Sequence, residues 1–308
     1  MAIIRGGNAE YGGDAIPPEE KINQIEETIQ RALLADNTTL NLSGKYFTDE
    51  DVKILARSEQ TRNVKTLDLC DNRIAGAELK TLLESPSFQN LEELRLGINS
   101  IIDENLVELA RTPIQITLRK LVLSDNRLTD ASTAEIVKSN NFGNLEELVL
   151  GWNQIGNGTA KALGETRSLN KLKILDLERS YIDDTGLAGL LQGTLLNTLE
   201  ELNLSSNKLG NAGIKTLAAT QNLGALRKLH LSANSFGDEG LKALGTSFSL
   251  SGLTELHLGR NYFTAEGAKA VRESPHLVHL KTLVLAEGPE NMPGRVNFSN
   301  PDLIRPGK

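Results

Sequence analysis

The sequence has almost no cysteine, few aromatic residues and no long apolar run. Cys70 is the single cysteine among 308 residues, so no disulfide can form within the chain, and a reducing compartment fits this best. No apolar stretch reaches the length of a membrane span, and the first residues lack the basic start and apolar core of a signal peptide. We therefore expect a protein without a membrane partner that is cytoplasmic, or secreted into a host cell without a standard signal peptide.

Positive charge is also scarce in this chain. Lys and Arg number 33 and Asp and Glu number 40, which gives a net charge of −7. Proteins that bind nucleic acid usually carry an excess of Lys and Arg that neutralises phosphates. The composition therefore predicts that nucleic acid is not a partner.

A repeat dominates the rest of the sequence. The stretch from Leu199 to Leu209 reads Leu-Glu-Glu-Leu-Asn-Leu-Ser-Ser-Asn-Lys-Leu, and its framework returns at intervals of 27 residues. Lys45, Ser180 and Gly288 stand at the last asparagine position in three units, so we count ten units. A fixed period of this size indicates a solenoid of stacked units. The units with the asparagine contain Asn72, Asn99, Asn126, Asn153, Asn207, Asn234 and Asn261.

Each unit has the pattern of a strand, a turn and a helix. The alternation at Leu67 and Leu69 is typical of a strand with one buried face. The stretch from Phe236 to Leu244 has a helical pattern, and its acidic residues suit a helix N-terminus. Because each new strand begins in the same phase, we expect parallel strands on a concave face and helices on the convex face.

The sequence predicts four segments. Residues 1–16 have glycines and no apolar periodicity, which predicts a mobile tail. Residues 17–36 are predicted to hold an N-terminal capping helix that runs to about Ala35, with Ile22, Ile25, Ile29 and Leu33 in one apolar stripe. The repeat array occupies residues 37–285. Prolines then interrupt the pattern, so residues 286–308 are expected to be an irregular C-terminal cap or tail.

The motif Leu-x-x-Leu-x-Leu-x-x-Asn-x-Leu resembles the signature of leucine-rich repeat proteins, and it is similar to the ribonuclease-inhibitor-like subfamily. Gly186, Gly213, Gly240 and Gly267 near the helix starts support that subfamily, whereas earlier units have Asp51, Glu78, Asn105, Ser132 and Thr159 there. The resemblance implies an α/β fold, a right-handed α/β horseshoe. It also implies a non-catalytic protein-protein interaction module that binds a protein on its concave face.

The repeated asparagines are in phase with the buried leucines. We therefore expect them to point inward and to hydrogen-bond backbone groups between neighbouring units, which is a structural role.

Specificity is expected at the outward positions of the strands, because packing does not select those residues. Ile98, Val122, Val149 and Trp152 predict an apolar patch on three consecutive strands, with Arg95 and Arg179 as its polar rim. Trp152 is the only tryptophan, and tryptophan is enriched at interface anchors. The predicted protein-binding residues are Arg95, Ile98, Val122, Val149, Trp152, Asp176, Arg179, His230, His257 and Arg260.

The sequence contains no arrangement that predicts catalysis or a cofactor. There is no Ser, His and acid set, no glycine-rich phosphate loop and no Cys and His metal pattern. His230 and His257 should lie side by side on adjacent strands, with Glu255 near, but a third ligand is not evident, so a solvated pair is favoured and no metal site is predicted. Cys70 is interpreted as an inert thiol, because neighbouring Asp71 disfavours its thiolate.

Charge alternates along two columns of the array. One column holds Lys65, Glu92, Arg119, Glu146, Lys173, Glu200 and Arg227, and its neighbour holds Glu93, Lys120, Glu147, Ile174, Glu201, Lys228 and Glu255. Opposite charges on paired strands favour one register. The alternative is a docking strip whose exposed ion pairs exchange partners, since such pairs contribute little stability.

Three functions stay open at this stage. The first is the binding module. It would be a monomer that acts as a bacterial effector, either in the cytosol or directed at a host cell. The second is a small-GTPase activator of the leucine-rich repeat type, for which Arg95, Arg179 and Arg260 are candidates, and which rests on analogy of fold. The third is a scaffold subunit of a larger assembly.

Overall fold

The computed structural model describes residues 17–33, 36–114 and 117–285. The predicted tail (residues 1–16) and C-terminal cap (residues 286–308) lie outside these residues. The described chain forms one parallel sheet of ten strands in chain order. The strands are β1 (Thr39–Asn41), β2 (Thr66–Asp68), β3 (Glu93–Arg95), β4 (Lys120–Val122), β5 (Glu147–Val149), β6 (Ile174–Asp176), β7 (Glu201–Asn203), β8 (Lys228–His230), β9 (Glu255–His257) and β10 (Thr282–Val284).

The helices follow the strands in alternation. They are α1 (Pro18–Ala32), α2 (Asp49–Leu55), α3 (Leu79–Glu84), α4 (Asp103–Arg111), α5 (Asp130–Lys138), α6 (Asn157–Glu165), α7 (Asp184–Leu190), α8 (Asn211–Ala219), α9 (Asp238–Thr246) and α10 (Ala265–Arg272). Short 3-10 helices η1 (Glu59–Thr61), η2 (Pro86–Phe88), η3 (Asn140–Phe142) and η4 (Thr194–Asn197) precede some strands.

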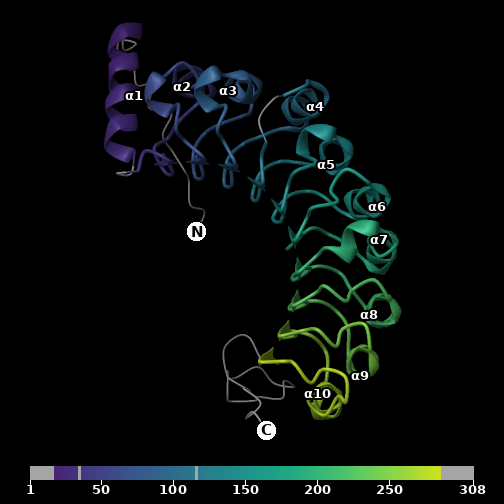
Figure 1. Cartoon of the computed structure of the whole chain (residues 1–308). Helices are drawn as coiled ribbons and strands as arrows, with labels where there is room; N and C mark the ends of the chain where they lie inside the picture. Colours follow the sequence, from purple (N-terminus) through teal and green to yellow (C-terminus); the bar gives the residue numbers. More distant parts are fainter. Residues whose placement is uncertain (1–16, 34–35, 115–116, 286–308) are drawn as a thin grey trace, which may run out of the picture.

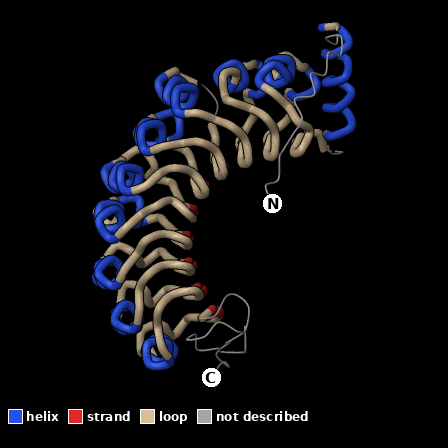
Figure 2. Tube along the Cα trace, turned by 180° about the vertical axis from the view of Figure 1, so that it is seen from behind, coloured by secondary structure: helices blue, strands red, loops and turns tan. Residues whose placement is uncertain are grey.

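The units stack into an open arc. Helices α2 to α10 lie along the outer side of the arc, and the strands line its inner side (Figures 1 and 2). A helix is about twice as wide as the 4.8 Å strand spacing, so stacking the two layers bends the array. The result is the α/β horseshoe that the sequence predicts.

The core lies between the two layers. Each strand residue faces the residue 27 positions later, as in Leu148 opposite Leu175. The two leucine columns of the strands are almost fully buried from Leu40 to Leu285. Because the same apolar side chain recurs at each step, the core is continuous from one unit to the next.

The asparagines form a ladder of hydrogen bonds beneath the turns. Asn153 Nδ2 donates to the carbonyls of Leu150 at 2.8 Å and Leu123 at 2.9 Å, and its Oδ1 accepts from the backbone N–H groups of Asn126 and Leu128. The same two kinds of carbonyl, one in the unit itself and one in the preceding unit, accept from Asn72, Asn99, Asn126, Asn207, Asn234 and Asn261.

A second ladder, which the sequence interpretation missed, runs along the starts of the outer helices. Asp130 accepts from the N–H groups of Gly156 at 2.7 Å, Gly158 at 3.0 Å and Thr159 at 2.9 Å in the next unit. We call this set the capping ladder. Its other members are Asp49, Asp103, Asn157, Asp184, Asn211 and Asp238, each of which accepts from a backbone N–H of the following unit.

The capping ladder explains part of the difference between units at the position that later units fill with glycine. The Thr159 hydroxyl donates to Asp130 at 2.6 Å, and Ser132 donates to Asp103 in the same way. In later units a Cβ on Gly186 would lie 2.1 Å from Asn157 Oδ1. The position takes a hydroxyl that donates to the ladder at Ser132 and Thr159 and a glycine that makes room for it from Gly186 on, whereas Asp51, Glu78 and Asn105 follow neither rule.

The N-terminal helix α1 differs in two details from the expected cap. It ends at Ala32 and not near Ala35. Ile25 and Ile29 are buried, as expected, but Ile22 is 44% exposed. The predicted stripe is wrong at Ile22, whereas Ile25 and Ile29 are in the core and Leu33 packs against it.

Candidate functional site

The concave face presents two rows of side chains, one residue per unit in each. The strand row consists of the last residue of each strand, namely Asn41, Asp68, Arg95, Val122, Val149, Asp176, Asn203, His230, His257 and Val284. The turn row lies three residues further on and consists of Asp71, Ile98, Asp125, Trp152, Arg179, Ser206, Ala233 and Arg260.

The turn row corrects the sequence interpretation. Ile98, Trp152, Arg179 and Arg260 were predicted at outward places of the strands, but they lie in the turns that follow. All residues of the turn row have a left-handed backbone, with φ between 50° at Arg179 and 62° at Trp152. This conformation turns the chain from the strand toward the helix, and it costs energy for residues other than Gly, Asn and Asp.

Four predicted binding residues stand side by side in the strand row. Val122 faces Val149, and this pair is flanked by Arg95 on β3 and Asp176 on β6. All four are partly buried. Two aliphatic side chains thus lie side by side between polar residues at the middle of the row, whose only other aliphatic member in the described residues is Val284 at its end.

The predicted apolar patch is less continuous than the sequence suggested. Ile98 and Trp152 are 54% and 45% exposed, but Asp125 occupies the unit between them in the turn row. The two large side chains therefore flank Asp125, and Val122 and Val149 connect them through the strand row. We call Ile98, Val122, Val149 and Trp152 the apolar patch.

Cations lie against some of the exposed aromatic side chains. The guanidinium carbon of Arg179 lies 4.3 Å from the centre of the Trp152 ring, and Lys208 Nζ lies 5.2 Å from the centre of the Tyr181 ring. Tyr181 is 54% exposed and follows Ser180, where the ladder asparagine is missing. The sequence interpretation named Tyr181 as part of a contact-site hypothesis for the unit around Ser180, but it did not include Tyr181 among the predicted protein-binding residues.

The charged columns pair across strands. Arg119 Nη2 lies 2.6 Å from Glu146 Oε1, and Lys173 Nζ lies 2.8 Å from Glu146 Oε2. Lys120 and Glu147 form a similar contact at 2.7 Å in the neighbouring column. These pairs line a hollow of about 340 Å³ on the concave side, whose other lining residues are Glu92, Glu93, Arg95 and Ile174. Each contact joins residues 27 apart, as register control requires.

Asp176 has its carboxylate occupied within the protein. One oxygen accepts from the backbone N–H of Glu178 at 2.8 Å, and the other accepts from Asn203 Nδ2 at 2.9 Å. Asp176 therefore holds its own turn and the side chain of Asn203 in place, and it also faces the concave side.

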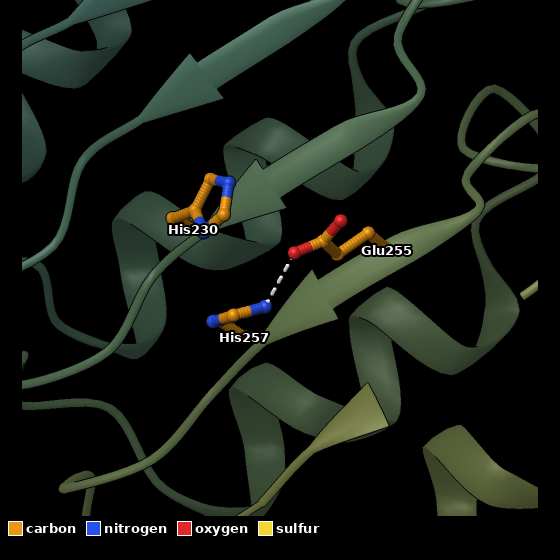
Figure 3. Close-up of side chains that lie close together, drawn as sticks. All are labelled: His230, Glu255 and His257. Atoms are coloured by element: carbon orange, nitrogen blue, oxygen red, sulfur yellow. Dashed lines mark hydrogen bonds and ion pairs between the residues drawn. The ribbon is translucent and has the colours of Figure 1, made fainter. Parts of the chain in front are cut away.

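The two histidines form a cluster with Glu255 (Figure 3). The rings of His230 and His257 are 4.5 Å apart between centroids and meet edge to face, and Glu255 Oε1 lies 2.7 Å from His257 Nε2. Glu201 Oε1 lies 3.6 Å from His230 Nε2. Burial, followed by the neighbouring His257, holds the pKa of His230 below its usual value. The sequence predicted the pair, but it did not identify Glu201 as a neighbour.

Cys70 is a half-buried thiol after β2. Burial, followed by a hydrogen bond to Asp68, raises its pKa to about 11. Asp71, which the sequence interpretation named as the cause, is not among the groups that shift this pKa. The thiol is therefore protonated at neutral pH, as expected of an unreactive cysteine.

Known proteins resemble this chain through its repeats. A family model described as leucine-rich repeat matches residues 115–132, 144–164, 196–218, 226–245 and 252–271. Together with the observed strands and helices, these matches identify the chain as a leucine-rich repeat protein. No match to a curated protein was found.

Among solved structures the chain is similar to the plant peptide hormone receptor RGFR1 in complex with RGF2. The sequence identity is 18% and the TM-score is 0.42, over 76% of this chain and 41% of the receptor chain. This chain thus spans about two fifths of the receptor's length. In the described residues, none of the helices combines the length and the apolar character that crossing a membrane requires.

Proposed function

We propose that the chain is a non-catalytic module of the ribonuclease-inhibitor-like type that binds a protein partner on its concave face, with the apolar patch as the anchor. The observation that carries the proposal is the exposure of Ile98 and Trp152 in turns with φ of 54° and 62°. A β-branched or bulky residue in this conformation costs about 1–2 kcal/mol relative to a relaxed backbone. Folding alone would favour Gly, Asn or Asp there, so binding is the better reason for Ile and Trp.

Trp152 is suited to anchor such an interface. A tryptophan buries a large rigid surface and keeps an N–H donor for a partner. Arg179 already covers part of its ring at 4.3 Å, and a cation on a ring face adds about 0.5–1 kcal/mol at an exposed site. This contact holds the Trp152 ring in place, which lowers the entropy that binding would cost.

The proposal includes the absence of catalysis. All three arginines that a GTPase activator could present interact within the protein, since Arg179 lies over Trp152, Arg95 contacts Glu93 at 3.3 Å, and Arg260 also has a partner. An arginine that must reach a bound nucleotide would first have to give up these contacts. We favour a binding role over the activator for this reason.

The setting of the module is also part of the proposal. We infer that it acts in a reducing compartment, in the cytosol or inside a host cell as an effector, because Cys70 is the single cysteine. Fractionation of cells that produce the untagged chain tests this setting, and recovery from an oxidising compartment would contradict it.

Affinity capture with matched variants tests the binding surface. The wild-type chain, the Trp152→Ala, Val149→Asp double variant and the Phe248→Ala variant are used as bait in parallel, followed by quantitative mass spectrometry. Phe248 is 77% exposed and follows α9, away from the apolar patch. The partner should be lost from the double variant and retained by Phe248→Ala.

Calorimetry on the captured partner gives the second measurement. Trp152→Ala should cost at least about 2 kcal/mol of affinity and leave circular dichroism unchanged. Full binding by a folded double variant would place the interface elsewhere and refute the proposal.

A further inference from the structure

We propose that His230, His257 and Glu255 bind a divalent transition-metal ion, with Zn²⁺ as the best match, on the concave face. The site lies on β8 and β9, apart from the apolar patch on β3 to β5 and the turns after them, so it stands independently of the proposed function. It also departs from the sequence prediction of no metal.

The three ligand atoms already converge. One nitrogen from each histidine and one oxygen of Glu255 lie within 4.8 Å of one another. Donors bound to Zn²⁺ at about 2.0–2.2 Å in a tetrahedral arrangement are roughly 3.3–3.6 Å apart. Small side-chain rotations therefore bring this set onto one ion. The backbone is in place, because the sheet register holds His230 directly opposite His257.

An unsatisfied nitrogen points to a missing ligand. His230 Nε2 is buried and makes no hydrogen bond, since its nearest carboxylate oxygen, on Glu201, is 3.6 Å away. A buried nitrogen without a partner is unfavourable. A metal ion would accept the lone pair of this nitrogen. The edge-to-face contact of the rings brings the histidines together but does not satisfy this atom.

The surrounding charge favours a cation. Asp176, Glu201 and Glu255 act on His230 as nearby negative groups. Lys228 opposes them, because it lies between Glu201 and Glu255 in register and contacts Glu201 Oε2 at 2.9 Å. Glu201 Oε1 faces the same nitrogen of His230 that would bind the ion, so its carboxylate adds negative charge beside the ion. Two histidines and one carboxylate leave a coordination position for water, as in catalytic zinc sites.

Zinc titration of the tag-free full chain tests the proposal. Calorimetry should show one Zn²⁺ per chain, and His230→Asn and His257→Asn should each weaken binding by at least about tenfold. The chain offers a matched control, because its two other histidines are His276 and His279. The His276→Asn, His279→Asn double variant and the Cys70→Ser variant should bind as the wild type does.

One variant of Glu255 and one of Lys228 locate the ion more closely. Glu255→Gln should weaken binding by roughly tenfold, and Lys228→Met should strengthen it by roughly three- to tenfold because a neighbouring cation is removed. Melting temperatures without zinc should be equal in all variants, so that lost binding is not lost folding. No binding by the wild type at 100 µM Zn²⁺, or undiminished binding by a folded His230→Asn, His257→Asn variant, would overturn the proposal.

Discussion

Asn153 shows how one side chain holds two units together. Its amide donates to carbonyls of its own unit and of the preceding one, and its oxygen accepts from two N–H groups. Ser180 occupies the same position with a shorter side chain, and its hydroxyl reaches only the carbonyl of Glu178, at 3.3 Å. An asparagine at this position therefore satisfies backbone groups that a serine cannot reach.

We expect Asn153→Ser to lower the free energy of unfolding by about 2 kcal/mol, because buried backbone groups lose their partners. Chemical denaturation measures this. The control is Asn140→Ser at an exposed residue, with an expected change within about 0.5 kcal/mol. Equal midpoints for the two variants would mean that the ladder does not stabilise the fold.

The turn row gives a second prediction at this scale. Ile98 has φ of 54°, so Ile98→Asn should raise the free energy of unfolding by about 1 kcal/mol. Val278→Asn serves as the control, because Val278 is also exposed, at 59%, but its φ is not positive. A thermal melt of both variants decides the matter. A loss of stability in Ile98→Asn would show that its side chain is needed for folding.

Helices α6 and α7 show how closely the outer elements pack. A Cβ on Gly164 would lie 2.0 Å from the carbonyl oxygen of Gly189, which is backbone and cannot move aside cheaply. Gly164→Ala should therefore cost about 2 kcal/mol of stability. Gly224→Ala is the matched control, because no atom lies within 4 Å of its Cβ. Similar melting temperatures for the two variants would refute the close contact.

The capping ladder makes the stability of the fold depend on pH in the acidic range. Burial alone would raise the pKa of Asp130, but hydrogen bonds from Thr159, Gly156 and Gly158 outweigh it and lower this pKa below its usual value of 3.8. The native state therefore favours the charged form more than the unfolded state does. The resulting stability is complete above the unfolded pKa and is lost as pH falls through the folded pKa.

Asp130→Asn tests this dependence, since Asn157 and Asn211 accept the equivalent backbone hydrogen bonds in other units. The variant should be about 1 kcal/mol less stable than wild type at pH 7, and the difference should shrink as the pH falls from about 5 to below 3.8. Asn211→Ala is the control, because a neutral ladder member should give the same difference at each pH. Denaturation series across this range measure both. A constant difference for Asp130→Asn would contradict the pKa shift.

The whole molecule is expected to be an elongated monomer. The open arc of Figures 1 and 2 is less compact than a globular protein of 308 residues, whose radius of gyration would be about 19 Å. X-ray scattering should give a clearly larger radius, and the result should not change with reducing agent, because Cys70 has no partner cysteine. A radius near that value, or a mass of two chains, would contradict this prediction.

The repeat fold was predictable because the interval between units is constant at 27 residues. Each residue therefore has the same place in its unit as the residue 27 positions later, which lies beside it in the next unit. The spacing alone determined the parallel register, the leucine columns, the inward asparagines and the pairs such as Lys173 with Glu146. Sequence reasoning also placed Val122 beside Val149 and His230 beside His257, since both pairs follow from register.

The tertiary structure determined the features of the concave face that the strand register does not specify. Ile98 and Trp152 lie in the turns and not on the strands as predicted. The backbone is left-handed at both residues, because the chain reverses there toward the helix. Side-chain reach across units placed Arg179 on Trp152 and brought Glu201 to His230. Such contacts depend on side-chain rotamers and on the curvature of the stack, and the spacing of residues along the chain specifies neither.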